Sequence, residues 1–191
     1  VVNLHRDVIY GERRKILSGA DLKANVQDMM HGEIQALVGK YIGERDRQEW
    51  NLDSLEADLL TIMPIPPELG KEELAGLEPA EIQDALLAHA DALYEQREKE
   101  LGAELMRTLE RAVMLRVIDS LWLEHLTVMQ NLRESIGLEA YGQRDPLVMY
   151  KKEAHETFNE LLTTVQHDIV HTIFHVLPVQ DGAAAPAGAT H

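Results

Sequence analysis

Two long apolar stripes joined by a short loop constrain the fold of this chain more than any other feature. Apolar side chains recur at steps of three and four over residues 101–136 and again over 147–173, which is the spacing of one face of an α-helix. Each arm holds roughly 30 residues or more, or about 45 Å at 1.5 Å per residue. The loop GLEAYGQRDPL at 137–147 is short, so the sequence predicts an antiparallel hairpin of two helices. The stripes consist of Leu101, Leu105, Leu109, Ala112, Val113, Val117, Leu121, His125, Met129, Leu132 and Ile136, and of Leu147, Tyr150, Ala154, Phe158, Leu161, Val165, Ile169 and Ile173.

Helical patterns also account for the N-terminal part of the chain. A stripe over residues 4–42 predicts helix, and the Ser18-Gly19 pair within it leaves open whether there is one helix or two. A shorter apolar pattern predicts a second helix near 52–62. No stretch shows the alternation typical of a strand, so we expect an all-α fold.

Prolines and one glycine mark the boundaries in the middle of the chain. The stretch MPIPPELG at 63–70 is expected to be irregular, because its prolines lack amide donors and disfavour helix in the residues before them. Glu78-Pro79 is expected to open a helix with proline at an early position. From there the pattern runs to Ile136, and Gly102 is its only weak point, at a cost of about 1 kcal/mol relative to alanine.

The composition excludes several classes of protein. The chain has no cysteine, so it forms neither disulfides nor thiolate metal sites. No apolar run approaches the roughly 18 residues that a membrane span needs, and no leader pattern opens the chain. We therefore expect a soluble, cytoplasmic protein, and the start in helical register indicates a segment of a longer one. The formal net charge is −15, and residues 44–104 hold 17 acidic against 5 basic side chains, which argues against nucleic acid as a partner.

Two patterns invite a metal interpretation. His167, His171 and His175 repeat every four residues, which places them on one helix face where two imidazoles can share a metal. The same histidines, near a helix C-terminus, also interact favourably with the helix dipole without any metal. We favour the second reading and predict no metal site.

The second pattern suggests a di-metal carboxylate site. The motifs DMMH at 28–31 and DIVH at 168–171 each place a carboxylate and a histidine at i, i+3, with Glu33 or Glu160 as candidate bridging ligands. Di-metal helical bundles use that spacing with Glu rather than Asp. Ordinary surface polarity explains the pattern better.

Three ring-bearing residues near the hairpin have different expected roles. Trp122 lies beside the apolar stripe, so we expect it to pack, although amphipathic aromatics also anchor interfaces. His125 lies on the stripe and is expected to be a hydrogen-bonded core histidine. Tyr141 is in the loop at the far end of the hairpin, where a rigid scaffold often presents functional residues. A contact with another polypeptide and simple loop packing are equally compatible with its position.

Much of the chain resembles the SecA preprotein translocase family. The segment RAVMLRVIDSLWLEHLTVMQNLRESIGLEAYGQRDPLVMYKKEA at 111–154 is similar to the C-terminal helical scaffold of that family. VIYGERRKIL at 8–17 resembles the start of its long scaffold helix, and REKELGAELMR at 97–107 resembles its return from the helical wing. The likeness extends to about Leu177. The occurrence of DSLWLEHL at 119–126 together with YGQRDPL at 141–147 makes it specific.

The resemblance implies a domain organisation and a set of partners. It implies a long scaffold helix over 1–43, an acidic helical wing over 44–104, a two-helix finger over 105–177 and a flexible tail over 178–191. The scaffold would pack against the motor domains, which bind ATP and Mg²⁺ and are missing from this chain, so the region itself would be non-catalytic and hold no cofactor. The finger would meet the SecYEG channel and unfolded preprotein at the inner face of the cell membrane. Whether two copies form a homodimer is left open.

The resemblance also assigns roles to individual residues. Tyr141 matches the tip tyrosine that contacts preprotein, and Gly137, Leu138 and Gly142 match the loop around it. Trp122 matches the finger tryptophan that is linked to regulation of ATP hydrolysis.

The sequence departs from the family pattern at three points. Glu139 stands where the family commonly has a basic residue, and neither the Walker motifs nor a cysteine-rich metal-binding tail is present. The main alternative from another class is a free-standing helical interaction or dimerisation module. A di-metal helical-bundle enzyme is the less favoured one.

Overall fold

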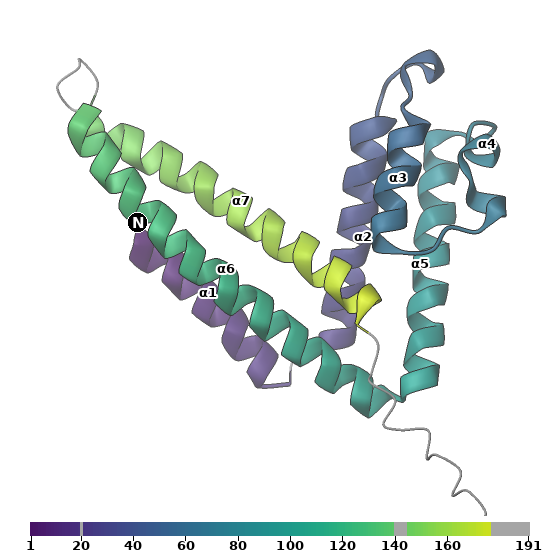
Figure 1. Cartoon of the computed structure of the whole chain (residues 1–191), viewed down its shortest axis with the longest axis horizontal. Coiled ribbons are helices and arrows are strands. Elements are labelled where there is room, and N and C mark those ends of the chain that lie inside the picture. The colour runs from purple at the N-terminus through teal and green to yellow at the C-terminus, as the bar shows by residue number, and fades with distance from the viewer. Residues whose placement is uncertain (20, 140–144, 177–191) are drawn as a thin grey trace, which may run out of the picture.

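The computed structural model of this chain describes residues 1–19, 21–139 and 145–176, and these are almost entirely helical (Figure 1). No strand occurs in those ranges, so the predicted all-α fold is confirmed. In chain order the elements are α1 (Val2–Leu17), α2 (Leu22–Tyr41), the 3-10 turn η1 (Arg47–Glu49), α3 (Leu52–Ile62), the 3-10 turn η2 (Pro67–Leu69), α4 (Lys71–Leu74), α5 (Pro79–Leu101), α6 (Ala103–Glu139) and α7 (Pro146–His175).

The helices form two arms that diverge from a common base (Figure 1). The long arm consists of α6 and α7, packed antiparallel along most of their length, with α1 packed against α6 and touching α7 through His5. The short arm consists of α2, α3, α4 and α5. At the base α2 also contacts α6 and α7, so this helix connects the two arms. The predicted helical hairpin is therefore present.

The range 1–43, predicted as one long scaffold helix, contains two helices that belong to different arms. α1 ends at Leu17, and Gly19 then takes a positive φ of 78°, a conformation that glycine adopts without steric cost. Asp21 restarts the helix, because its side chain accepts a hydrogen bond from the Ala24 amide at 3.1 Å. The Ser18-Gly19 pair thus ends a helix, so of the two arrangements that periodicity left open, the structure has two helices rather than one.

Gly102 separates the arms a second time. It takes φ 86° and ψ 145° between α5 and α6, a backbone region essentially restricted to glycine. A Cβ at this position would meet no neighbouring atom, so the requirement is conformational rather than steric. The helical pattern that runs from Pro79 to Ile136 in the sequence is therefore two helices at an angle, divided close to the expected start of the finger.

The predicted helix starts are confirmed by their caps. Glu78 and Glu81 form a reciprocal capping box ahead of α5, with Pro79 in its first turn. Asp145 accepts a hydrogen bond from the Leu147 amide at 3.0 Å and so caps α7, again with proline in the first turn.

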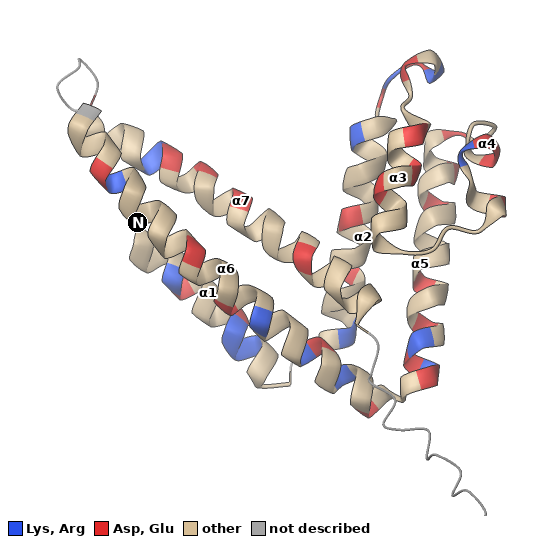
Figure 2. Cartoon of the chain, viewed as in Figure 1, with Lys and Arg blue, Asp and Glu red and all other residues tan. Residues whose placement is uncertain are grey.

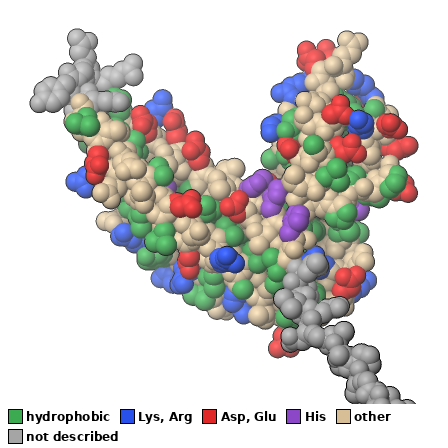
Figure 3. Space-filling model, viewed as in Figure 1, with side chains coloured by type: hydrophobic (Ala, Val, Ile, Leu, Met, Phe, Trp, Pro, Cys, Tyr) green, Lys and Arg blue, Asp and Glu red, His purple; other side chains and the backbone are tan. Residues whose placement is uncertain are grey.

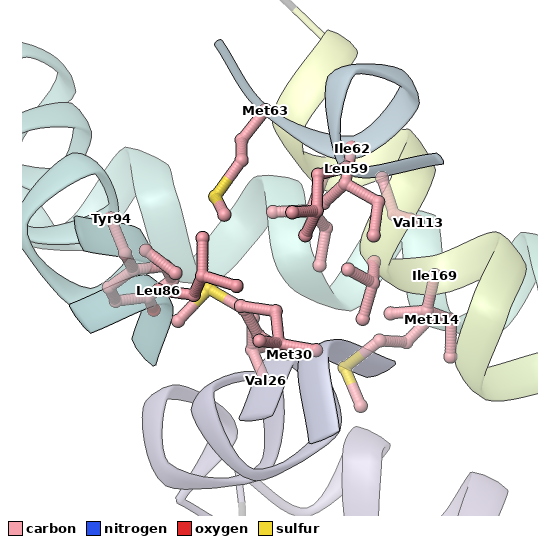
Figure 4. Close-up of a cluster of buried hydrophobic side chains, with 14 of the residues drawn as sticks. Val26, Met30, Leu59, Ile62, Met63, Leu86, Tyr94, Val113, Met114 and Ile169 are labelled. Carbon is pink, nitrogen blue, oxygen red and sulfur yellow. The ribbon is translucent and has the colours of Figure 1, made fainter. Parts of the chain in front are cut away.

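The hydrophobic core is thickest where the arms meet (Figure 4). Side chains from α2, α3, α5, α6 and α7 converge there, and burial of apolar surface contributes about 25 cal/mol per Å². Labelled members of this cluster are Val26, Met30, Leu59, Ile62, Met63, Leu86, Tyr94, Val113, Met114 and Ile169. This cluster therefore joins the two arms at their base.

The buried face of α6 differs from the predicted stripe. The predicted core residue Leu105 is 48% exposed, and Leu109, Val117 and Leu121 line an open groove of about 660 Å³ beside α7. The buried side chains of this helix are Met106, Glu110, Val113, Met114, Ile118, Trp122, His125, Met129 and Ile136. α1 packs against this buried face, with Tyr10 beside Trp122 and His5 beside His125, a contact that periodicity within α6 does not reveal.

Acidic side chains recur along the helices of the short arm (Figure 2). Several are paired locally: Lys71 contacts Asp53 at 2.5 Å, and Arg47 pairs with Glu78. Exposed pairs of this kind contribute little to stability. The predicted tail at 178–191 lies outside the described residues.

Candidate functional site

The free end of the hairpin holds the residues predicted to contact preprotein. Gly137 and Leu138 occupy the last turn of α6 and are exposed, with 80% of Leu138 accessible. Tyr141 and Gly142 lie outside the described residues, so the tip contact stays a prediction.

Trp122 joins the hairpin to α1. Only 6% of its surface is exposed, and its ring lies 6.4 Å from the Tyr10 ring in an edge-on arrangement. Beside it an open groove of about 620 Å³ is lined by Asp7, Tyr10, Arg13, Arg14, Asp119, Trp122 and Leu123. Arg13 on α1 pairs with Asp119 on α6 at 2.9 Å across this groove. The expected packing role of Trp122 is confirmed, and its role in regulation remains a prediction.

A buried pair of histidines extends the contact between α1 and α6 along the hairpin. His5 Nδ1 and His125 Nε2 lie 3.1 Å apart, and the His5 ring stacks on Phe158 of α7 at a centroid distance of 4.1 Å. Both histidines are buried, so His125 is the hydrogen-bonded core histidine that the sequence predicts. Burial, with the neighbouring His125, lowers the pKa of His5 from 6.5 to about 4. One imidazole has to donate and the other to accept, which requires at least one neutral ring.

We expect this pair to make stability fall as the solution is acidified. Because the folded pKa of His5 is below its unfolded value, its contribution is complete above pH 6.5 and is lost as pH falls toward 4. Between pH 6.5 and pH 4, the free energy of unfolding measured in urea should fall by about 2–3 kcal/mol more in the wild type than in His5→Leu. Leu4→Ala, at an exposed position of the same helix, should keep the wild-type dependence of stability on pH. Equal slopes in wild type and His5→Leu would contradict the assignment.

A buried polar network crosses the junction between α5 and α6. Glu110 is fully buried; Tyr94 Oη donates to its Oε1, and Arg107 Nε lies 3.2 Å from its Oε2. Arg107 also donates to Tyr94 Oη at 3.0 Å and pairs with Glu98, which Lys23 of α2 contacts at 3.0 Å. Burial raises the pKa of Glu110, while the Lys23 hydrogen bond lowers the pKa of Glu98.

Sequence reasoning missed this network. A signal was available, because Glu110 lies four residues after Met106 and four before Met114, both buried. A charged residue at an apolar position of a helix is buried only with partners.

The structure brings together only part of the predicted histidine pattern. One ligand atom from each of Glu33, His167 and His171 lies within 4.8 Å of the others. His175 instead contacts the His171 carbonyl oxygen through Nδ1 at 2.6 Å. His31, a member of the proposed di-metal set, contacts Asp91 at 2.7 Å. Within the described ranges the two-metal arrangement does not form, and Glu33, His167 and His171 are the group of three candidate ligands that comes together there.

Histidine side chains gather at the base of the cleft between the arms (Figure 3).

None of the helices in the described part of the chain is long and apolar enough to cross a membrane.

The fold and these contacts define an interaction scaffold: a long helical hairpin braced by a third helix and joined to a smaller acidic helical arm. The family profile of the SecA wing and scaffold domain matches residues 1–177, and the chain belongs to this family.

Relatives named protein translocase subunit SecA match over nearly all of the chain. The protein of Dehalococcoides mccartyi strain CBDB1 is 53% identical over 176 residues, which are 92% of this chain and 18% of the relative. That of Syntrophomonas wolfei is 41% identical over 181 residues, 94% of this chain and 22% of the relative. That of Roseiflexus strain RS-1 is 42% identical, with 92% and 18% covered. The chain thus spans about a fifth of the length of these relatives.

Proposed function

We propose that this chain is the wing and scaffold part of a preprotein translocase, in which the α6–α7 hairpin reaches toward a membrane channel and contacts unfolded preprotein at its free end. The observation that supports the proposal most is the hairpin itself, two long helices packed against each other and braced by α1, whose buried side chains join the same core. Such an arm is stiff, because bending it would expose apolar surface at about 25 cal/mol per Å². Movement at its base is therefore transmitted to its end.

The channel in this proposal is SecYEG, and the residues that meet preprotein are Gly137, Leu138, Tyr141 and Gly142. Exposed Leu138 supports an apolar contact that tolerates many sequences. Tyrosine adds a large apolar face and a hydroxyl at low entropic cost. The protein would act at the cytoplasmic face of the membrane as a peripheral component.

The region would contribute no nucleotide chemistry of its own. Its sequence has neither a Walker pattern nor a dinucleotide fingerprint, so ATP and Mg²⁺ would be bound by other domains of the longer protein. The groove beside Trp122 is a suitable place for those domains to sense the hairpin, because α1 and α6 meet there around Tyr10 and the Arg13–Asp119 pair. In this proposal Trp122 keeps ATP hydrolysis low until channel and preprotein engage the hairpin.

Substitution of Trp122 tests this role. In the full-length translocase that carries this region, Trp122→Ala is expected to raise ATP hydrolysis severalfold in the absence of channel and preprotein, because the contact between α6 and α1 loosens. Steady-state phosphate release measures the effect, with Val128→Ala as a control on an exposed position of the same helix. Trp122→Phe, which keeps an aromatic ring, should be intermediate. An unchanged basal rate in a Trp122→Ala protein that retains wild-type helicity would contradict the regulatory role.

A further inference from the structure

We propose that Glu33, His167 and His171 form a binding site for one divalent metal ion of the zinc class, which would link the short arm to the long arm. Glu33 lies on α2, and the two histidines lie one turn apart on α7. The proposal is independent of preprotein contact and of ATP hydrolysis.

The distances between the side chains fit a tetrahedral ion. Ligand atoms about 2.1 Å from such a metal are about 3.4 Å apart. His167 Nδ1 lies 3.2 Å from Glu33 Oε2, and the ligand atoms of all three residues lie within 4.8 Å of one another. The two imidazole rings have centroids 3.9 Å apart.

The donor set selects among metals. Two imidazoles and one carboxylate suit zinc and its neighbours in the first transition row, whereas calcium and magnesium prefer oxygen ligands alone. Three protein ligands leave one position for water. His167 is about half exposed, so an ion can reach the site from solvent.

Surrounding contacts hold the carboxylate in place. Glu33 is 8% exposed, and its second oxygen, Oε1, accepts a hydrogen bond from Gln166 Nε2 at 3.1 Å. Hydrogen bonds of this kind orient a ligating carboxylate and raise metal affinity. Gly32 permits the close approach, since a Cβ at this position would lie 3.0 Å from Gln166 Nε2. The carboxylate is thus positioned before any ion arrives.

The site has a mechanical consequence because its ligands come from different arms. α2 packs with α3 and α5 in the short arm, and α7 is one half of the hairpin. A bound ion would add a coordinate link between them beside the junction core. Occupancy would then hold the hairpin at a fixed angle to the short arm.

Zinc titration of the whole chain tests the proposal. Isothermal calorimetry is expected to show one zinc ion per chain, and the absence of cysteine removes competing thiolate sites. Zinc at about 100 times its dissociation constant should raise the melting temperature by about 5–10 °C, and a chelator should reverse the shift. Failure to bind one equivalent of zinc would overturn the proposal.

Single substitutions separate a site across two helices from a histidine pair on one helix. Glu33→Gln, His167→Gln and His171→Gln should each weaken binding at least tenfold and abolish the melting shift. His155→Gln and His175→Gln, on the same helix, should retain both. Wild-type affinity in Glu33→Gln would show that zinc is held by α7 alone and would overturn the link between the arms. Circular dichroism of each variant without zinc verifies that it is folded.

Discussion

Replacement of Arg107 by methionine is expected to lower the free energy of unfolding by about 3–4 kcal/mol at pH 7. The substitution leaves Glu110, which is fully buried, without its cation, and removal of one partner of a buried ion pair costs about 3–5 kcal/mol. The loss has an upper limit, because Glu110 can take up a proton instead of staying charged and unpaired. Protonating a glutamate costs about 1.36 kcal/mol for each pH unit above its unfolded pKa of about 4.3, which sets that limit at pH 7. Urea unfolding monitored by circular dichroism measures the effect.

The same variant should show a characteristic pH dependence. Without Arg107 the folded pKa of Glu110 lies further above its unfolded value, so the protonated form stabilises the fold at low pH and the stabilisation is lost as pH rises. The difference in the free energy of unfolding between wild type and Arg107→Met should therefore become smaller as the pH is lowered from 7 to 5. A double variant, Arg107→Met with Glu110→Met, should recover much of the loss, because no unpaired charge remains. A deficit below about 1 kcal/mol at pH 7 would contradict the assigned role of the pair.

Substitution of Tyr141 by serine is expected to have the largest effect on function. In the full-length translocase, we expect preprotein translocation into channel-containing vesicles to fall at least about tenfold, the loss typical of a central aromatic contact. The folded state should be unaffected, because position 141 falls between the end of α6 at Glu139 and the start of α7 at Pro146 and so belongs to neither helix. Protease protection of the translocated preprotein measures the rate.

Two controls define the chemistry of that contact. Tyr141→Phe keeps the ring and should retain most of the activity, whereas Leu138→Ser removes exposed apolar surface from the neighbouring turn and should cause a partial loss. Wild-type translocation by Tyr141→Ser would eliminate the tip tyrosine as a preprotein contact. Equal loss in the Phe and Ser variants would assign the effect to the hydroxyl and contradict a sequence-tolerant apolar contact.

Helix type and helix starts were predictable because local chemistry determines them. Asp145-Pro146 and Glu78-Pro79 combine a capping side chain with a residue whose fixed φ suits the first turn, and both open helices as expected. The hairpin followed from two long stripes and a loop too short for any other arrangement. These features depend on residues within a few positions of one another.

Features that depend on distant contacts were not predictable from periodicity. The direction of the chain after Gly19 and after Gly102 depends on backbone angles that a helical pattern does not encode, so periodicity could not decide between one helix and two at the first of these positions. The buried face of α6 includes Trp122 because α1, more than a hundred residues earlier in the chain, packs against it. A stripe in the sequence identifies one packed face, whereas α6 has several partners.

In the candidate sites too, local spacing was predictable from the sequence and contacts between distant residues were not. The spacing of His167 and His171 placed both on one face of a helix, but the sequence named no carboxylate partner for that pair. Glu33, which lies beside them in the structure, comes from α2 and was considered only as a ligand of the two-metal arrangement. The Tyr94–Glu110 contact joins two helices across the turn at Gly102. Pairings of this kind require the tertiary arrangement.

Disulfide crosslinking at position 141 tests the proposed function most directly. The chain lacks cysteine, so Tyr141→Cys in a full-length translocase otherwise free of cysteine gives a single reactive site at the hairpin tip. A preprotein with cysteines at successive positions is stalled in the channel, and Glu124→Cys, exposed midway along α6, serves as the matched control. The proposal predicts crosslinks from position 141 to several preprotein positions and none from position 124. No crosslink at 141, in a translocase whose ATP hydrolysis still responds to preprotein, would contradict the tip contact and leave the hairpin only its scaffold and regulatory roles.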